Sequence, residues 1–213
     1  MENRSALDSA AFWKMMEAVC RRVQEKKDWL SELDAACGDG DHGVSMGRGF
    51  AAIEGQLAGW NGLAPGVLFK KVGMSLVSAV GGATGPLLGT VFMEAGKAAG
   101  DQAEITATTL AAMFAAGLDG MVKRGGAKCG DKTMVDALEP AALKSVELTA
   151  APLDQTLAAV TEAARLGMEK TKEIVAATGK AKTLGERSLG HPDPGAVSTW
   201  LILKFMREYV MQT

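Results

Sequence analysis

Three aspartates stand close together in residues 33–43, LDAACGDGDHG, and their spacing predicts a cation site. Asp34, Asp39 and Asp41 fall within eight positions and are interleaved with three glycines. Carboxylates this close repel one another when all are ionised, and a bound cation removes that repulsion. Oxygen ligands alone favour a hard ion such as Mg²⁺ or Ca²⁺. Because glycines let the backbone approach whatever the cation holds, we expect a phosphate compound as the second ligand.

Other interpretations of this segment are simpler. A stretch rich in Asp and Gly is commonly a solvated turn, and this alternative stays open for the segment taken alone. Gly38, Gly40 and Gly43 also match the GxGxxG fingerprint of dinucleotide-binding proteins. That fingerprint follows an apolar strand, whereas the preceding WLSELDAAC is mixed and carries two acids. An EF-hand is excluded because its alternating oxygen ligands and closing Glu are missing at the required spacing.

The composition indicates a globular protein with a sizeable core. Of the 213 residues, 47% are hydrophobic and 23% are charged, which suits one large domain or two small ones. A net charge of −2 offers no basic surface for nucleic acid or a membrane, and no apolar run approaches the roughly 18–20 residues of a membrane span. Cys20, Cys37 and Cys129 form no disulfide framework. Since the first residues do not match a signal peptide either, we expect a cytoplasmic protein.

The sequence predicts helices almost throughout. Ala, Leu, Met, Lys and Glu dominate, and no segment sustains the alternation of a strand. Apolar residues recur at helical spacing, as at Phe12, Met16, Val19 and Val23. Because no clear linker interrupts the chain, we expect one all-α domain over residues 1–213. The eight expected helices cover 6–27, 42–57, 66–80, 86–100, 107–123, 132–147, 153–177 and 195–211.

Four glycine-rich segments precede every second expected helix. They are GDGDHG (38–43), GGATGP (81–86), GGAKCGDKT (125–133) and GHPDPGA (190–196). If consecutive helices run antiparallel with short connections, all four segments meet at one end of the domain. The helices that follow them then direct free N–H groups and positive dipole ends at that rim. Such an arrangement favours an anion, phosphate above all.

Each of these segments also has a local structural interpretation. Thr84, Asp131 and Asp193 are expected N-caps of the helices that follow, with Pro194 in the first turn of the last one. A cap does not exclude a ligand contact by the adjacent backbone. The run GGAKCGDKT is close to the P-loop pattern, but an aspartate precedes Lys132 and no strand comes before the loop. We therefore reject a P-loop fold.

The histidines leave their roles open. His42 and His191 both fall in the glycine-rich segments, and each is either a structural hydrogen-bonding group or a ligand contact. No Ser/His/Asp or Cys/His arrangement for nucleophilic catalysis is recognisable. We therefore expect no catalytic residue in this chain beyond the predicted cation and phosphate site.

Five motifs follow one another over nearly the whole chain, namely LDAACGDGDHG (33–43), GRGF (47–50), GGATGPLLGT (81–90), GDKTMVDALEPA (130–141) and LGERSLGHPDPGA (184–196). Together and in this order they resemble the L subunit, or L domain, of dihydroxyacetone kinases. The resemblance implies an all-α barrel of eight antiparallel helices with the nucleotide bound at one end. It also implies that ADP or ATP binds through two Mg²⁺ ions held by Asp34, Asp39 and Asp41.

The resemblance further implies which residues contact the nucleotide. Lys180 stands where the family often has Arg, and it keeps the charge of Arg but loses the fork of its guanidinium. Ser45 and Thr84 stand where Asn and Ser are common. The implied contacts are His42, Gly43, Val44, Ser45, Ala83, Thr84, Gly125, Met134, Lys180, Pro192, Asp193 and Pro194.

The implied activity is phosphoryl transfer to dihydroxyacetone (glycerone) held on a separate K-type subunit. In one branch of the family, bound ADP is recharged by a phosphohistidine (M-type) protein of the phosphoenolpyruvate:sugar phosphotransferase system. In the other branch, ATP is the donor, and the ketose can be a relative such as erythrulose. A third possibility is a regulatory module that binds a transcriptional regulator when loaded with Mg-nucleotide. The sequence alone leaves these alternatives open.

Overall fold

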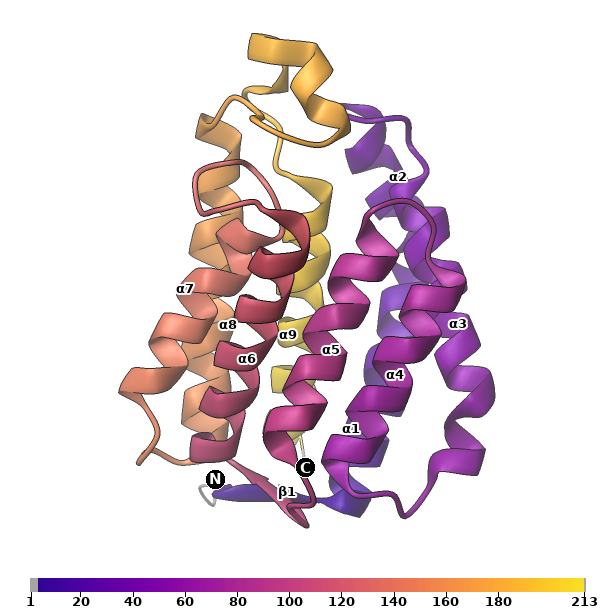
Figure 1. Ribbon diagram of the computed structural model, residues 1–213, viewed down its shortest axis with the longest axis vertical. Helices are drawn as coiled ribbons and strands as arrows, with labels where there is room; N and C mark the ends of the chain where they lie inside the picture. Colours follow the sequence, from indigo (N-terminus) through magenta and orange to yellow (C-terminus); the bar gives the residue numbers. More distant parts are fainter. Residues whose placement is uncertain (1–3, 213) are drawn as a thin grey trace.

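The computed structural model describes residues 4–212, and these residues form an all-α fold (Figure 1), as predicted. Two three-residue strands, β1 (Ala6–Asp8) and β2 (Glu104–Thr106), pair antiparallel at one end. Short 3-10 helices cover η1 (Ala58–Trp60), η2 (Thr171–Glu173) and η3 (Lys180–Ser188). The α-helices are α1 (Ser9–Glu25), α2 (Lys27–Ala35), α3 (His42–Leu57), α4 (Pro65–Ala79), α5 (Thr84–Ala99), α6 (Ala107–Gly125), α7 (Val135–Glu147), α8 (Leu153–Lys170) and α9 (Pro194–Gln212).

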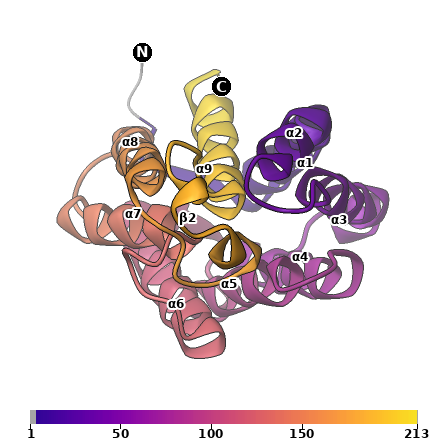
Figure 2. The ribbon, with the colours of Figure 1, turned by 90° about the horizontal axis from the view of Figure 1, so that it is seen from above.

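Eight of these helices pack in a closed sequence of neighbours. From α3 to α9 each helix contacts the next one, while α1 contacts both α3 and α9. Figure 2 shows these helices from above. Their inward faces carry the core, in which the rings of Phe12 and Phe92 each lie 4.9 Å from the ring of Phe69. Met16 and Met46 are fully buried among them, as expected for methionines that fill irregular gaps.

Glycines bring α4 and α5 unusually close together. A methyl group on Gly73 would lie 2.6 Å from the carbonyl oxygen of Gly89, and one on Gly96 would lie 2.6 Å from that of Gly66. The distance between two helix axes is set by the side chains at their contact. The backbones of α4 and α5 therefore meet directly, which fixes the position at which α5 begins.

Two of the predicted helix boundaries are wrong. The expected helix over 6–27 ends at Glu25, where the N–H of Lys26 bonds to the carbonyl of Val23, and α2 follows as a separate ninth α-helix of residues 4–212. Leu30 and Asp34 are the only buried residues of α2, so it has no apolar stripe that could reveal it. The two strands were not expected either, because three residues are too few to show alternation.

The second wrong boundary creates the part of the fold that covers the site. The expected helix over 153–177 ends at Lys170 as α8, and residues 171–193 then cross the end of the helices before α9 begins. We call residues 171–193 the cap; it lies at the top of Figure 1 and contains η2 and η3. Within residues 4–212, no helix has the length and apolar character needed to cross a membrane.

Candidate metal and nucleotide site

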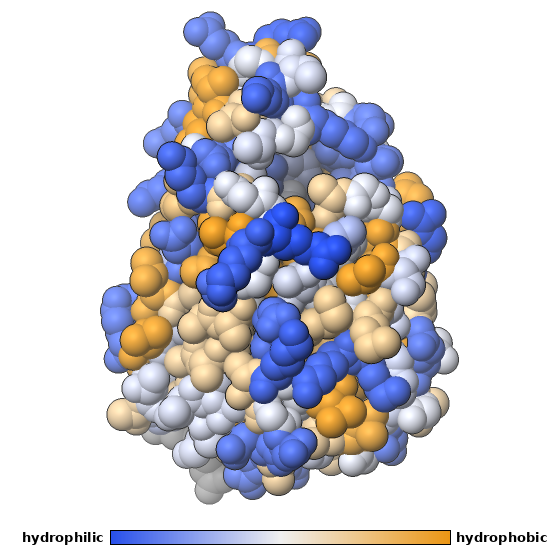
Figure 3. Space-filling model, in the orientation of Figure 1, coloured by the Kyte–Doolittle hydropathy of each residue, from blue (hydrophilic) through white to orange (hydrophobic). Residues whose placement is uncertain are grey.

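A cavity of about 340 Å³ opens at the end of the molecule where α3, α5, α7 and α9 begin. All four glycine-rich segments contribute to its lining, so the predicted rim is confirmed. Hydrophilic residues gather over this end on the face seen in Figure 3. The residues that line the cavity include Asp34, Asp41, His42, Ser45, Ala83, Thr84, Gly125, Lys132, Thr133, Met134, Thr178, Gly179, Lys180, Asp193, Pro194 and Gly195.

The three aspartates converge at the mouth of this cavity. One carboxylate oxygen from each of Asp34, Asp39 and Asp41 lies within 4.8 Å of the others. Asp34 comes from the last turn of α2 and is 7% exposed, whereas Asp39 and Asp41 are exposed on the loop before α3. The N–H of His42 donates to Oδ2 of Asp34 at 3.1 Å and fixes that carboxylate. A donor set made only of oxygens at this spacing fits Mg²⁺ or another hard divalent cation.

The loop between α2 and α3 needs glycine to bring the carboxylates together. A methyl group on Gly38 would lie 2.2 Å from Oδ1 of Asp34. Gly40 has a φ of 77°, a left-handed conformation that costs residues with a side chain free energy. These two glycines therefore serve the geometry of the carboxylates, and their expected role, to let the backbone approach a bound ligand, stays a prediction.

Lys180 reaches the same cluster from the cap. Its Nζ lies 2.6 Å from Oδ1 and 2.5 Å from Oδ2 of Asp39, and 3.2 Å from Oδ1 of Asp41. The hydrogen bonds to Lys180 lower the pKa of Asp39, and the bonds to Asp39 raise the pKa of Lys180. The ammonium thus compensates part of the charge that the carboxylates bring together.

The four helix starts around the cavity bring the positive ends of their helix dipoles to it, while several of their first N–H groups are bonded within the protein, that of His42 to Asp34 and that of Ala196 to Asp193. The first N–H groups of an α-helix have no carbonyl partner within the helix, and the helix dipole adds positive potential there. Ala83 and Thr84 at α5, Met134 at α7 and Pro194 at α9 all line the cavity. The arrangement can hold phosphate groups without an arginine side chain that binds them.

Only one of the three predicted N-caps is correct. The Asp193 side chain accepts the N–H of Ala196 at 2.7 Å and caps α9. Thr84 is already inside α5, since Ala83 before it has helical φ and ψ and no side chain caps this helix. Asp131 lies too far from the start of α7, and its Oδ2 accepts the N–H of Lys128 at 2.9 Å instead.

Asp136, rather than Asp131, holds the loop before α7, while Oγ1 of Thr133 accepts the N–H of Val135 at 3.1 Å. This buried carboxylate accepts the N–H groups of Gly130 at 2.6 Å and Thr133 at 2.7 Å. Because Asp136 lies in the first turn of α7, it holds the loop against its own helix from inside the fold. An aspartate in the first turn of a helix also interacts favourably with the helix dipole.

Four of the expected site residues do not line the cavity. Asp39 reaches the site through its contact with Lys180. Gly43 instead permits close packing of α3 on α2, because a methyl group there would lie 2.0 Å from the carbonyl oxygen of Lys27. The side chain of Val44 is turned outward, with 52% of the residue exposed. Pro192 is partly buried, and its carbonyl accepts a weak bond from Sγ of Cys37 at 3.7 Å.

The two histidines play structural parts. His42 is buried, and its Nε2 lies 3.0 Å from Oγ of Ser198, which ties α3 to α9. Burial lowers the pKa of His42, so the imidazole is held in its neutral form. His191 is exposed, and its backbone carbonyl accepts a hydrogen bond from Nζ of Lys132 at 2.7 Å.

Lys132 is the principal cavity residue that sequence reasoning missed. It is only 2% exposed, and its ammonium contacts the cap rather than the glycine-rich loop around it. The P-loop-like spacing singled this lysine out, but the loop follows helix α6 rather than a strand, which confirms that it is not a P-loop. Nothing in the sequence indicated which groups the lysine would contact.

Comparison with known proteins agrees with this geometry. The model of the DAK2 domain family matches residues 36–208 of the chain. The PEP-dependent dihydroxyacetone kinase 1, ADP-binding subunit DhaL, of Listeria innocua is 45% identical over 187 residues, which are 87% of this chain and 88% of that protein. The L-erythrulose 1-kinase of Mycolicibacterium smegmatis is 37% identical over 190 residues, which are 85% of this chain and 32% of that protein.

A solved structure shares the fold. The crystal structure of the dihydroxyacetone kinase from C. freundii in complex with AMP-PNP and Mg²⁺ matches with a TM-score of 0.72 and 30% sequence identity. The match covers 96% of this chain and 35% of that one. Since the family model spans most of the sequence and the Listeria relative aligns along nearly its whole length, the chain belongs to the DAK2 domain family.

Proposed function

We propose that this chain is the nucleotide-binding subunit of a dihydroxyacetone-type ketose kinase and that it works with ADP as a bound coenzyme. The observation that carries the proposal is the convergence of three aspartates at the mouth of a cavity surrounded by four helix starts. Oxygen ligands suit Mg²⁺, and helix starts suit phosphate. The names of the Listeria relative and of the C. freundii complex supply the same pair of ligands.

The metal part of the proposal assigns two Mg²⁺ ions to Asp34, Asp39 and Asp41. Asp34 is held in place by the N–H of His42, while Asp39 and Asp41 face solvent where they can bind ions that arrive with a nucleotide. Bound between the carboxylates and the phosphates, the metal ions would offset the negative charge on the transferred phosphoryl group.

The nucleotide part assigns the phosphates to the four helix starts and Lys180 to the phosphate charge. Lys180 enters the cavity from the cap and has the charge that this role requires. The residues assigned to the nucleotide are His42, Gly43, Val44, Ser45, Ala83, Thr84, Gly125, Met134, Lys180, Pro192, Asp193 and Pro194. Several of them would act through backbone N–H groups, because the Gly43 and Val44 side-chain positions face away from the cavity.

The chain's part in the reaction would be positioning and electrostatics. Phosphoryl transfer needs little covalent chemistry from the protein. This is consistent with the expectation that the chain carries no catalytic nucleophile. We propose that residues 1–213 act as one domain, that a K-type subunit holds the ketose, and that a phosphohistidine protein of the phosphotransferase system recharges ADP. A cytoplasmic location fits the three free cysteines.

One specific observation favours a second candidate, an ATP-dependent kinase of a related ketose. The L-erythrulose 1-kinase of M. smegmatis contains a region 37% identical to 85% of this chain. Mass analysis of the purified protein separates the two candidates. ADP that co-purifies and resists dialysis favours the phosphotransferase-system reaction, whereas a protein that binds and releases ATP favours the second candidate.

The decisive experiment compares Asp39→Asn with Asp101→Asn. Asp101 is an exposed aspartate after α5, at the opposite end of that helix from the cavity. We expect Asp39→Asn to abolish phosphoryl transfer to dihydroxyacetone in the presence of a K-type partner, and to weaken binding of Mg-ADP in calorimetry. Circular dichroism should show the same helix content in both variants. Wild-type turnover in Asp39→Asn would contradict the proposed metal site.

A further inference from the structure

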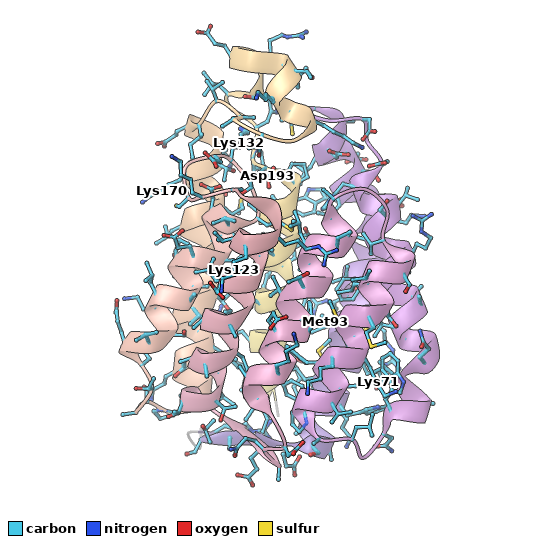
Figure 4. The ribbon with its side chains drawn as sticks, viewed as in Figure 1. Lys71, Met93, Lys123, Lys132, Lys170 and Asp193 are labelled. Carbon is cyan, nitrogen blue, oxygen red and sulfur yellow. The ribbon has the colours of Figure 1, made fainter. Side chains whose placement is uncertain are left out.

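Lys132 is a buried lysine whose ammonium is surrounded by backbone carbonyls of the cap. Its Nζ lies 2.7 Å from the carbonyl oxygens of Thr171, Ser188 and His191, and 3.2 Å from that of Ile174. Figure 4 shows Lys132 close beneath the cap. An ammonium has three donors, so these four acceptors satisfy it completely.

The backbone of Lys132 is strained. Its φ is 63°, and it is the only residue other than glycine with positive φ in the described residues 4–212. A lysine in this left-handed region costs more than a glycine would. A turn alone would therefore favour glycine at this position, and the contacts of the side chain account for a lysine here.

Apart from the bonds of Lys132 and those of Lys180 to Asp39 and Asp41, the cap has few contacts that hold it to the rest of the fold. Its buried apolar residues, Ala176 and Ala181, form a small cluster with Cys37 that is separate from the main core. The N–H of Ala177 donates to the carbonyl of Asp131 at 3.2 Å. Since so little apolar surface is buried there, polar contacts must supply much of the free energy that closes the cap.

The four carbonyls come from both ends of the cap. Thr171 begins η2 and Ile174 follows it, whereas Ser188 ends η3 and His191 lies three residues beyond. One ammonium therefore joins the segment that leaves α8 to the segment that enters α9, and it does so from the loop between α6 and α7. Lys180 lies between these two anchored ends of the chain.

We propose that Lys132 is a positioning residue that holds the cap closed over the cavity and thereby sets Lys180 against the aspartates. The proposal rests on the proposed nucleotide site only for its functional consequence. The alternative, that Lys132 binds phosphate as a P-loop lysine does, requires its ammonium to leave four carbonyls. Those carbonyls would then be left without their donor, which is unfavourable in a buried site.

The test compares Lys132→Met with Lys128→Met in the protein free of nucleotide and metal. Methionine has nearly the same length as lysine but carries no charge and no donor. Lys128 is exposed on the same loop and is a matched control. Trypsin cleaves after Lys and Arg, and the cap offers Lys172, Lys180, Lys182 and Arg187 as sites.

We expect Lys132→Met to speed tryptic cleavage within the cap by about tenfold or more, because each lost donor leaves a carbonyl unsatisfied. The helix content and the cleavage rate elsewhere should match those of the Lys128→Met control. The affinity for Mg-ADP, measured by calorimetry, should fall by about tenfold. Cap protection equal to the wild type would overturn the proposal, whatever happens to nucleotide binding.

Chemical rescue keeps the proposal testable if Lys132→Met does not fold. Lys132→Gly relieves the backbone strain and leaves a channel the size of the lost side chain. Added n-butylammonium, which carries the same four carbons and ammonium, should restore cap protection. Tetraethylammonium has the charge without N–H donors and should not restore it. Failure of n-butylammonium to restore protection in Lys132→Gly, folded or not, overturns the proposal.

The two readouts separate this inference from the proposed function. Cap opening in Lys132→Met with unchanged Mg-ADP affinity supports the role of Lys132 in holding the cap, and it contradicts the proposed contact of Lys180 with the nucleotide. Cap opening together with a weaker affinity for Mg-ADP supports both the role of Lys132 in holding the cap and the contact of Lys180 with the nucleotide. The proteolysis is carried out without nucleotide, so its outcome does not depend on whether the chain binds ADP.

Discussion

The carboxyl of Asp193 gives the structure a pH dependence that can be measured. Asp193 caps α9 and lines the cavity, and desolvation raises its pKa from 3.8 to about 7. This value already includes smaller effects: the charges of Asp136 and Asp34 add to the rise in pKa, while the bond from the N–H of Ala196 and the charge of Lys132 oppose it. The folded protein therefore binds a proton at Asp193 more tightly than the unfolded chain does.

The sign and size of the effect follow from this difference. A raised pKa in the folded state adds stability at low pH, and that stability is lost as the pH rises through about 7. Between pH 5 and pH 8 the free energy of unfolding should fall by at most about 2.5 kcal/mol from Asp193 alone, at 1.36 kcal/mol per pKa unit. The figure is an upper limit, because one side of the carboxyl faces the cavity.

Asp193→Asn removes the titration and keeps the cap, since asparagine caps helices as well as aspartate does. Unfolding by urea at several pH values, without metal or nucleotide, gives the difference between variant and wild type. We expect this difference to grow in favour of the variant as the pH rises from 5 to 8. His42, whose pKa burial lowers, adds the opposite trend, in which stability is lost as the pH falls, and it cancels in the difference.

A matched control for this experiment is Asp101→Asn. Asp101 is exposed, so its replacement should shift the free energy of unfolding little and by a constant amount across the pH range. If Asp193→Asn gives the same constant offset, the carboxyl is not destabilised in the folded state, and the reasoning from its burial is refuted.

Three further predictions concern stability. Mg-ADP at a hundred times its dissociation constant should stabilise the fold by about 2.7 kcal/mol, seen as a higher melting temperature, and no shift would contradict the site. Gly43→Ala should lower the free energy of unfolding by about 1–3 kcal/mol or more in urea unfolding, because the new methyl group would meet the carbonyl of Lys27. Gly55→Ala in the same helix, where no other atom lies near, should instead raise it by roughly 0.5–1 kcal/mol. Asp8→Ala should lower the free energy of unfolding in urea by about 1 kcal/mol, because Asp8 caps α1. Thr84→Ala should change it little, because Thr84 caps no helix, and a large loss in this variant would show that Thr84 is a cap after all.

Much of the site could be predicted because its signals are local or periodic. The spacing of Asp34, Asp39 and Asp41 placed three carboxylates within eight residues, at the end of α2 and in the short loop that follows it, and so short a segment cannot separate them far. The rim required only that helices alternate in direction, and short connections ensure this. The roles assigned to individual nucleotide contacts remain predictions.

What the sequence could not indicate depends on contacts between distant segments. Lys132 bonds to carbonyls 39 to 59 positions away, and backbone carbonyls carry no sequence signal. The buried face of α2 is too short for a periodic pattern, so this helix was missed: the first predicted helix ended at residue 27 and the next began at residue 42. Thr84 and Asp131 had the right residue types for N-caps, but α5 begins one residue earlier than a cap at Thr84 requires, and α7 begins three residues later than a cap at Asp131 requires.

The charges around the cavity explain why metal and nucleotide should bind as a unit. At the mouth of the cavity, three carboxylates face one ammonium from Lys180 and four helix starts, each equivalent to about half a positive charge, so these groups together are close to neutral. Lys132 and Asp193, which also line the cavity, oppose one another in charge when Asp193 is ionised. A phosphate compound alone would make it strongly negative, and a divalent cation alone would compete with Lys180 for the exposed carboxylates of Asp39 and Asp41. When both arrive, the cation balances the phosphates and the ammonium is free to turn toward them. Each ligand must then raise the affinity for the other by the same factor, because the coupling free energy is shared.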